Sequence, residues 1–337
     1  MRKYLLPREG RFYKANLHCH TTNSDGKLTP AEVKELYQSM GYSVVAFTDH
    51  DVLVPHPELT DENFLALNGF EVEINERDEE KDWSHRKTCH ICFVGLTPEN
   101  VEQPFFNPAY LFANARQAAE LVQYDKSQPF YERRYEPECI NEMMRIARQK
   151  GFFVTYNHPV WSQEDYSDYS RYEGMHAFEI VNYGCVVEGY EEYNTQVYTD
   201  LLRKGRRIFA VASDDNHNRF PYGDRRCDSG GGFIMIKADK LEYRTITKAM
   251  EAGSFYASEG PKIEELYEED GEVFIRCSPA DRIFMSTDCR VAQAFFAENG
   301  ELLTEARFTI PQNCTYFRFT VTDASGKHAS TNAYFLA

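Results

Sequence analysis

Two histidines two residues apart, followed five residues later by an aspartate, are the first residues of the chain that could do chemistry. They are His18, His20 and Asp25. The alternating run from Phe12 to Leu17 predicts a strand, in which residues i and i+2 point to the same face. His18 and His20 could therefore bind one metal ion together, and a Ser-Asp-Gly turn would bring Asp25 toward them. Taken alone, the pair also fits a strand end with two exposed histidines.

Further imidazoles and carboxylates follow apolar runs elsewhere in the chain. The complete candidate metal-binding set is His18, His20, Asp25, His50, Glu71, His90, His158, Asp215 and His217. Active sites of α/β barrels lie at the carboxyl ends of the strands, so residues that are distant in sequence would converge there. Imidazole and carboxylate suit Zn, Mn and Fe. One ion takes about four to six ligands, so we expect two or three divalent ions.

The elements that must position these residues follow a strand–helix–strand order. Thr29 as N-cap, Pro30 at the first helical position and Glu32 in a capping box predict a helix over 29–41. The apolar run 43–47 predicts a strand buried on both faces. Further strands are expected at 65–74, 89–96, 152–156, 177–181, 208–212 and 231–237, and further helices at 137–150, 190–204 and up to about 252. About seven such units favour a closed α/β barrel over an open sheet.

The pattern changes near residue 260. Residues 261–337 consist of short alternating runs with turn signals between them, which predicts a small antiparallel β-sandwich. We expect it to serve packing or oligomerisation. Residues 1–260 would then form the barrel, interrupted by an insertion at about 97–137 that is rich in Pro, Asn, Gln and Tyr and has one helical stretch, near 113–122.

Composition and charge exclude several classes of function. The net charge of −16 argues against an extended nucleic-acid-binding surface, which needs a basic face. The sequence has no apolar run of the ~20 residues that span a membrane, and its first residues are too short for a signal peptide, so we expect a cytoplasmic protein. The nine cysteines are scattered, and Cys89 and Cys92 lie in a strand-like run, so neither a disulfide framework nor a thiolate zinc site is expected.

Charge also indicates the kind of substrate. The charge of three divalent ions would exceed the negative charge of the three carboxylates in the set. Even with a bridging hydroxide, the pocket would keep a net charge of about +2. Such a pocket would attract a dianion, and phosphate monoesters are the common biological dianions. Metal ions also lower the pKa of bound water and hold the attacking and leaving oxygens. No nucleophile-elbow, Walker or dinucleotide glycine motif competes, because Gly230–Gly232 lacks the required spacing.

The motifs of residues 12–260 resemble those of the PHP superfamily, the polymerase and histidinol phosphatase family of metal-dependent phosphoesterases. The matching motifs, in order, are His18-x-His20-Thr with Ser-Asp-Gly at 24–26, Thr48-Asp49-His50, Gly69-x-Glu71, the strand that carries His90, His158-Pro159, and Ser213-Asp-Asp-Asn-His217. The last motif has one residue more than in many relatives, so Asp214 or Asp215 could be the ligand. We choose Asp215 because Asp-x-His repeats the same-face spacing of His18 and His20.

The resemblance implies a distorted (βα)7 barrel, similar to a TIM barrel, that holds three metal ions. His18, His20, Glu71 and Asp215 would bind one ion, Glu71 would bridge to a second ion held by His90 and His158, and Asp25, His50 and His217 would bind the third. Asp49 would orient an imidazole. Arg219, or else Arg225 or Arg226, would contact a phosphate unless it is a plain surface arginine. The carboxy-terminal sandwich resembles the immunoglobulin-like tail of relatives that hydrolyse carboxylic or carbamate esters.

We therefore predict a phosphoesterase in which a metal-bound hydroxide attacks a small phosphorylated metabolite or a short nucleotide. One alternative is hydrolysis of a non-phosphate ester, amide or carbamate by the same metal cluster. The other is a non-catalytic module that holds metal and binds a ligand or partner. The complete set of ligands argues against the second alternative, because a binding module has little need of every metal-activating group.

Overall fold

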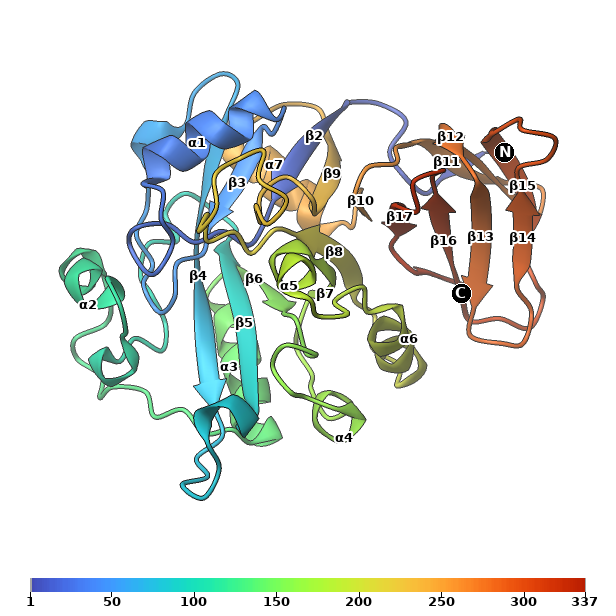
Figure 1. Ribbon diagram of the computed structural model, residues 1–337. Coiled ribbons are helices and arrows are strands. Elements are labelled where there is room, and N and C mark those ends of the chain that lie inside the picture. The colour runs from blue at the N-terminus through green and yellow to red at the C-terminus, as the bar shows by residue number, and fades with distance from the viewer. Residues whose placement is uncertain (1, 337) are drawn as a thin grey trace.

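Seven strands of the larger part of the molecule lie side by side in the order in which they occur in the chain (Figure 1). The computed structural model describes residues 2–336. The strands are β2 (Arg11–Asn16), β3 (Val44–Phe47), β4 (Leu65–Asn75), β5 (Thr88–Gly95), β6 (Phe152–Tyr156), β7 (Ala177–Asn182) and β8 (Phe209–Ser213). On the other side of β2 follow β9 (Phe233–Ala238) and β10 (Phe255–Ser258). The apolar core of this part lies against these strands.

Strand β5 runs antiparallel to both of its neighbours, whereas the pairs β2–β3, β3–β4, β6–β7 and β7–β8 are parallel. The beginning of β5 therefore lies beside the end of β4, and His90 is opposite Glu73. This direction explains why a histidine near the start of a strand joins residues that stand at the ends of others.

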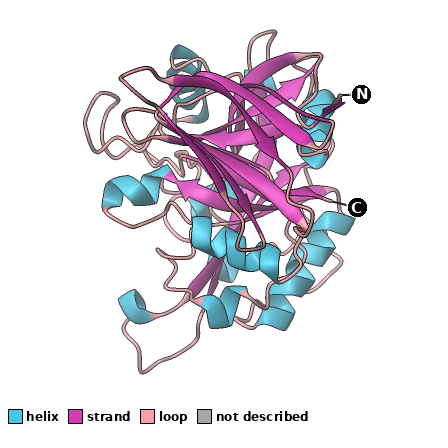
Figure 2. Cartoon of the chain, turned by 90° about the vertical axis from the view of Figure 1, so that its right-hand side faces the viewer, coloured by secondary structure: helices cyan, strands magenta, loops and turns pink. Residues whose placement is uncertain are grey.

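Helices surround the strands, which occupy the middle of the molecule (Figure 2). The longer ones are α1 (Pro30–Ser39), α3 (Pro137–Gln149), α6 (Thr195–Arg203) and α7 (Tyr243–Glu251). The predicted capping box of α1 is present, with Thr29 and Glu32 bonded to each other's backbone. The short helical elements are α2 (Ala115–Ala118), α4 (Tyr166–Tyr169), α5 (Tyr183–Glu188), and the 3-10 turns η1 (Pro57–Leu59), η2 (Trp83–His85), η3 (Pro108–Tyr110) and η4 (Ala119–Leu121). Within residues 2–336, no helix has both the length and the apolar character required to cross a membrane.

The predicted closed barrel is not confirmed, because the sheet described for residues 2–336 has two ends, one at β8 and the other at β14. Asparagine side chains take the place of a neighbouring strand at the β8 end. The backbone N–H of Ala210 donates to Asn332 Oδ1 at 2.9 Å, and that of Asp214 donates to Asn16 Oδ1 at 3.0 Å. These bonds satisfy backbone donors of β8 and of the residue after it, so the chain does not need to close the ladder.

The carboxy-terminal part consists of two antiparallel layers with a separate apolar core between them. One layer is a four-stranded sheet of β1 (Lys3–Tyr4), β11 (Ile263–Glu269), β12 (Glu272–Ala280) and β15 (Leu303–Thr309). The other contains β13 (Arg282–Thr287), β14 (Gln293–Phe296), β16 (Tyr316–Thr322), β17 (His328–Thr331) and β18 (Tyr334–Phe335). The immunoglobulin-like character of this part stays a prediction.

The two parts share strands across the predicted boundary near residue 260. Strand β10 pairs with β9 on one side and with β17 on the other, so one sheet continues from the first part into the second. The amino-terminal strand β1 pairs with β11, and Leu6 lies in the core of the second part. The first residues of the chain thus pack with its last third.

Candidate metal centre

The first possible ion site is formed by His18, His20, Glu71 and Asp215, all of which are buried. The two Nε2 atoms of the histidines lie 3.1 Å apart. Nε2 of His20 is 2.9 Å from Oδ1 of Asp215, and Nε2 of His18 is 3.2 Å from Oε1 of Glu71. Ligands bound to one zinc ion at about 2.1 Å lie roughly 3–3.5 Å from one another. The four side chains therefore have the spacing of a single ion's ligands.

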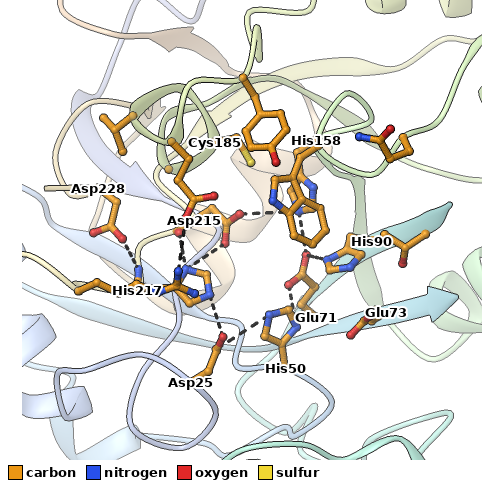
Figure 3. Close-up of a pocket in the computed structure, with 18 of the residues that line it drawn as sticks. Asp25, His50, Glu71, Glu73, His90, His158, Cys185, Asp215, His217 and Asp228 are labelled. Carbon is orange, nitrogen blue, oxygen red and sulfur yellow. Dashed lines mark hydrogen bonds and ion pairs between the residues drawn. The ribbon is translucent and has the colours of Figure 1, made fainter. Parts of the chain in front are cut away.

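A second group surrounds the same glutamate (Figure 3). Nδ1 of His50 is 3.1 Å from Oε2 of Glu71, and Nδ1 of His90 is 3.1 Å from Oε1. Nε2 of His158 lies 3.4 Å from Oε1 as well. Glu71 thus stands where a carboxylate that bridges two ions would stand. The resemblance implied His90 and His158 as partners of Glu71 at the second ion, and the structure adds His50 to them.

The third group brings together His20, Asp25, His50 and His217. Nε2 of His217 is 3.2 Å from Oδ2 of Asp25, and Nε2 of His50 is 4.0 Å from Oδ1 (Figure 3). These are the three residues that the resemblance implied for a third ion, with His20 added. All nine predicted ligands therefore lie in one connected cluster. Their roles as ligands stay predictions.

Several polar atoms of the cluster are buried, and their close contacts with one another lack the angles of a hydrogen bond, so they have no hydrogen-bond partner among the residues that the structure describes. They are His20 Nδ1, His50 Nδ1, His90 Nε2, Glu71 Oε2 and Asp215 Oδ1. A buried polar atom without a partner costs about 1–3 kcal/mol, and such atoms are rare in folded proteins. Bound cations would partner these atoms. The donor set, imidazole nitrogens and carboxylate oxygens, therefore fits divalent ions of the Zn, Mn or Fe type.

Electrostatics within the cluster keep its carboxylates charged. Against the effect of burial, the neighbouring imidazoles hold the pKa values of Glu71 and Asp215 well below their usual range. Burial disfavours protonation of His158, but Glu71 and Asp215 raise its pKa to about 9. Burial and the nearby His20 lower the pKa of His50 to about 3. The cluster is a concentration of negative charge that requires positive charge, either protons or metal ions, to remain buried.

Glu179, on β7, is the functional candidate that the sequence reasoning missed. Its Oε1 lies 3.0 Å from Nδ1 of His18, and its Oε2 accepts the backbone N–H of His158 at 3.1 Å. A carboxylate that accepts from Nδ1 fixes the tautomer of the ring, so that Nε2 of His18 points its lone pair at the ion site. A signal was present, because Glu179 interrupts an apolar run in the same way as Glu71.

Asp215 rather than Asp214 faces the imidazoles. The carboxylate of Asp214 turns away and accepts the backbone N–H groups of Gly230, Gly231 and Gly232 at 2.7–2.9 Å. The choice made from the Asp-x-His spacing agrees with this geometry. The glycine run that lacked a nucleotide-binding pattern has a structural role instead, since it holds the carboxylate next to a candidate ligand.

Asp49 occupies a different place from the one implied by the resemblance. Its carboxylate accepts the backbone N–H of Thr21 at 2.7 Å, the hydroxyl of Thr21 at 2.8 Å and the hydroxyl of Ser24 at 2.7 Å. It therefore fixes the loop that carries Asp25, whereas we expected it to orient an imidazole. A direct catalytic role of Asp49 stays a prediction.

A cavity of about 660 Å³ opens above the cluster. Aromatic rings stand close to the ligands: the ring of Trp161 lies 5.2 Å from that of His90, and the ring of Phe112 lies 5.0 Å from that of His50. The arginines that line the cavity are Arg86, Arg219 and Arg226. Of the three arginines considered from the sequence, Arg225 is exposed and does not line it.

No protein-family model matches this sequence, and no curated protein matches it either. Among solved structures, the chain is similar to a two-domain protein from Bacteroides vulgatus that is described as containing a predicted PHP-like metal-dependent phosphoesterase. That likeness covers 99% of this chain and 98% of the other, with 14% identity and a TM-score of 0.46.

Two further solved structures are similar over less of the chain. One, from Bifidobacterium adolescentis, is described as a candidate metal-dependent phosphoesterase, with 18% identity over 65% of this chain and 91% of the other and a TM-score of 0.38. The other, from Chromobacterium violaceum, is described as an amidohydrolase with bound sulfate and no metal, with 17% identity over 72% and 96% and a TM-score of 0.41.

Proposed function

We propose that this protein is a metal-dependent phosphoesterase that hydrolyses a small phosphorylated metabolite or a short nucleotide. The observation that carries the proposal is the buried cluster of imidazoles and carboxylates, with its unpartnered atoms, at the base of a cavity of about 660 Å³. Two or three divalent ions of Zn, Mn or Fe would be held there. Bound ions of this kind lower the pKa of a coordinated water toward neutrality and polarise the ester oxygen.

The chain's own residues would hold the ions, keep water out and attract the substrate. Glu71 lies within 3.4 Å of ring nitrogens of five histidines and would fix the spacing between ions. The rings of Trp161 and Phe112 line the cavity next to imidazoles of the cluster and would reduce the local dielectric, which strengthens electrostatic interactions there. Arg86 and Arg219 line the same cavity and would attract an anionic group.

One observation favours a second candidate function, the hydrolysis of a non-phosphate ester, amide or carbamate. Nη1 of Arg219 lies 3.6 Å from Oε1 of Glu188, and Nη2 of Arg226 lies 2.8 Å from Oδ2 of Asp224. An arginine that is already paired with a carboxylate contributes less to the attraction of a dianion. A neutral substrate would have less need of free arginines.

A substrate panel distinguishes these functions. The purified protein is assayed with p-nitrophenyl phosphate, bis-p-nitrophenyl phosphate and p-nitrophenyl acetate in the presence of Mn²⁺ or Zn²⁺. Our proposal expects phosphate-ester turnover that EDTA abolishes. Turnover of the acetate alone would support the second candidate, and bound metal without any turnover would indicate the non-catalytic module.

The variant His158→Ala should retain the fold and lose most turnover, because it removes one of the groups around Glu71. His85→Ala, which removes an exposed histidine, is the matched control and should turn over substrate at the unaltered rate. If His158→Ala and His85→Ala both turn over substrate at nearly the wild-type rate, the assignment of the site is contradicted.

A further inference from the structure

A buried arginine links the 97–137 segment to the metal centre. Arg133 is 3% exposed, and its Nη1 lies 2.6 Å from Oδ1 of Asp51, which is 2% exposed. Nη1 also donates to the carbonyl oxygen of Glu73 at 3.1 Å, and Nη2 donates to that of Phe105 at 3.3 Å. The guanidinium lies 4.5 Å from the centre of the Tyr110 ring. A desolvated ion pair with this many contacts fixes the position of both partners.

Asp51 connects this ion pair to the candidate ligands His50 and Glu71. It directly follows His50, its backbone is in the left-handed region with φ of +60°, and its N–H donates to the carbonyl oxygen of Glu71 at 2.7 Å. A non-glycine residue adopts such a conformation at a cost, so the surroundings must hold it there. The side chain of Gln103 does so from the same segment, since its Nε2 donates to the Asp51 carbonyl oxygen at 2.8 Å.

The segment also contacts His50 itself and the loop that carries Asp25. The ring of Phe112 lies 5.0 Å from that of His50. The backbone N–H of Asn114 donates to the carbonyl oxygen of Ser24 at 3.0 Å, and its side chain donates to that of Thr22 at 3.2 Å. These two carbonyls belong to the loop that carries Asp25. The segment therefore packs against one ligand of the third group, His50, and against the loop that positions another, Asp25.

We propose that the 97–137 segment positions the ion held by His20, Asp25, His50 and His217, and that Arg133 is the positioning residue through which it acts. This inference rests on the proposed metal centre. The first ion site also uses Glu71, but its other ligands depend on the residues after β2 and β8 and on Glu179. Loss of the Arg133 contacts should therefore weaken this ion more than the ion at the first site.

The test measures metal content and affinity rather than turnover. Wild type, Arg133→Gln and the control Arg134→Gln are loaded with Mn²⁺, dialysed against a series of competing chelator concentrations, and analysed for bound metal per chain. Arg134 is adjacent in sequence but exposed and paired with Glu136, so it is a matched control. We expect one ion per chain to bind to Arg133→Gln at least tenfold less tightly than to wild type and to Arg134→Gln, with a smaller change for the other ions.

Arg133→Gln leaves a buried carboxylate without its partner and could prevent folding. A second variant, Phe112→Ala with Asn114→Ala, avoids this problem, because neither residue is fully buried. It should weaken the same ion without changing the melting temperature of the metal-free protein. Equal metal affinity in wild type and both variants would overturn the inference but leave the proposed function intact. Loss of all ions together from the variants, with wild type still loaded, would have the same consequence. Absence of bound metal from wild type would overturn both.

Discussion

Glu71 is the residue on which the candidate centre converges. Its two oxygens lie 3.1–3.4 Å from ring nitrogens of five histidines, and Oε1 also accepts from the side chain of Asn157 at 2.9 Å. It stands in the middle of the long strand β4, where its pKa is held low by the imidazoles in spite of burial. A single carboxylate at this position would be able to bridge ions, because the five surrounding rings come from four different segments: the residues after β2, β3 and β6, and strand β5.

A substitution of Glu179 tests whether this carboxylate holds the ring of His18 in the orientation that metal binding requires. The substitution Glu179→Gln should weaken metal binding by about 10–100-fold, because the amide fixes the tautomer of His18 less firmly than a carboxylate does. Chelator competition measures the change. Glu191→Gln, at an exposed position nearby, is the control. Unchanged metal affinity in Glu179→Gln would show that Glu179 has no role in holding His18.

At the scale of residues, the sequence predicted which groups gather but not all of their supports. Most of the nine candidates were found because they stand beside an apolar run at a predictable strand end, and a Gly-x-Glu motif marked Glu71, which lies within its strand. Glu179 was missed because no such motif marks it inside its apolar run, and the sequence does not show which face of the strand points to the cluster. The place of Asp49 was missed for a related reason, since its hydroxyl partners belong to a loop whose path the sequence does not specify.

At the scale of elements, the run Gly230–Gly232 supports the residues that follow β8. The N–H groups of these glycines donate to the carboxylate of Asp214. Gly232 lies so close to the backbone of Ser213 that no side chain fits between them. Gly232→Ala would place a Cβ against the Ser213 carbonyl oxygen. We expect a loss of roughly 1–3 kcal/mol in unfolding free energy together with weaker metal binding, because Asp215 would be displaced.

Chemical denaturation and chelator competition measure these two effects. Gly260→Ala is the matched control, since its added Cβ would meet the flexible side chain of Lys327 at 3.2 Å, which can move away. A Gly232→Ala protein as stable as Gly260→Ala would contradict the tight approach seen here.

The turn between β6 and α4 contains a buried carboxyl that should make stability depend on pH. Burial raises the pKa of Glu164 from 4.5 to about 7, although Tyr135, Tyr156 and Tyr172 donate hydrogen bonds to it. Below about pH 4.5 the carboxyl is protonated in the folded and the unfolded chain. Above about pH 7 it is ionised in both, so the folded state is less stable there by on the order of 3 kcal/mol.

The unfolding free energy of wild type relative to Glu164→Gln should therefore fall as the pH rises from about 4.5 to about 7. Urea denaturation across this range measures it, with Glu120→Gln, at an exposed position, as the control. A relative stability that rises with pH would show that the tyrosine hydrogen bonds outweigh burial.

Most elements of the larger part were predictable because their hydrophobic periodicity and caps agree. The capping box of α1 and the buried run of β3 lie where the sequence placed them. The antiparallel direction of β5 was not predictable, because an apolar run predicts a strand but does not show in which direction it runs beside its neighbours. The predicted helix near 113–122 is broken into α2 and the 3-10 turn η4, where contacts with neighbouring segments outweigh a weak periodicity.

At the scale of the whole molecule, asparagine side chains bind the backbone at the β8 end of the sheet, so the number of strands alone does not determine whether the sheet closes. Seven strand units suggested a barrel, but Asn16 and Asn332 bind the backbone at the β8 end, and the second of these comes from the last third of the chain. The sequence could not show that two asparagines meet this edge. Nor could it show that β1 joins the second part, since a strand of two residues has no detectable pattern.

The second part of the molecule is attached to the first by specific contacts. The rings of Tyr193 and His328 stack at 4.3 Å, and Nη2 of the buried Arg318 donates to the hydroxyl of Thr199 at 3.1 Å. Together with the shared sheet through β10, they fix the sandwich against the segments around α6 (Figure 1). The sandwich therefore supports the side of the sheet on which β8 and its candidate ligands lie.

The central claim is that the convergent imidazoles and carboxylates bind several cations in one pocket. Anomalous diffraction from crystals soaked in Mn²⁺ or Zn²⁺, recorded at the absorption edge of the metal, tests it most directly. The account predicts two or three peaks, one of them surrounded by His18, His20, Glu71 and Asp215. A pocket without peaks at saturating metal, or peaks bound only by surface side chains elsewhere, would contradict it.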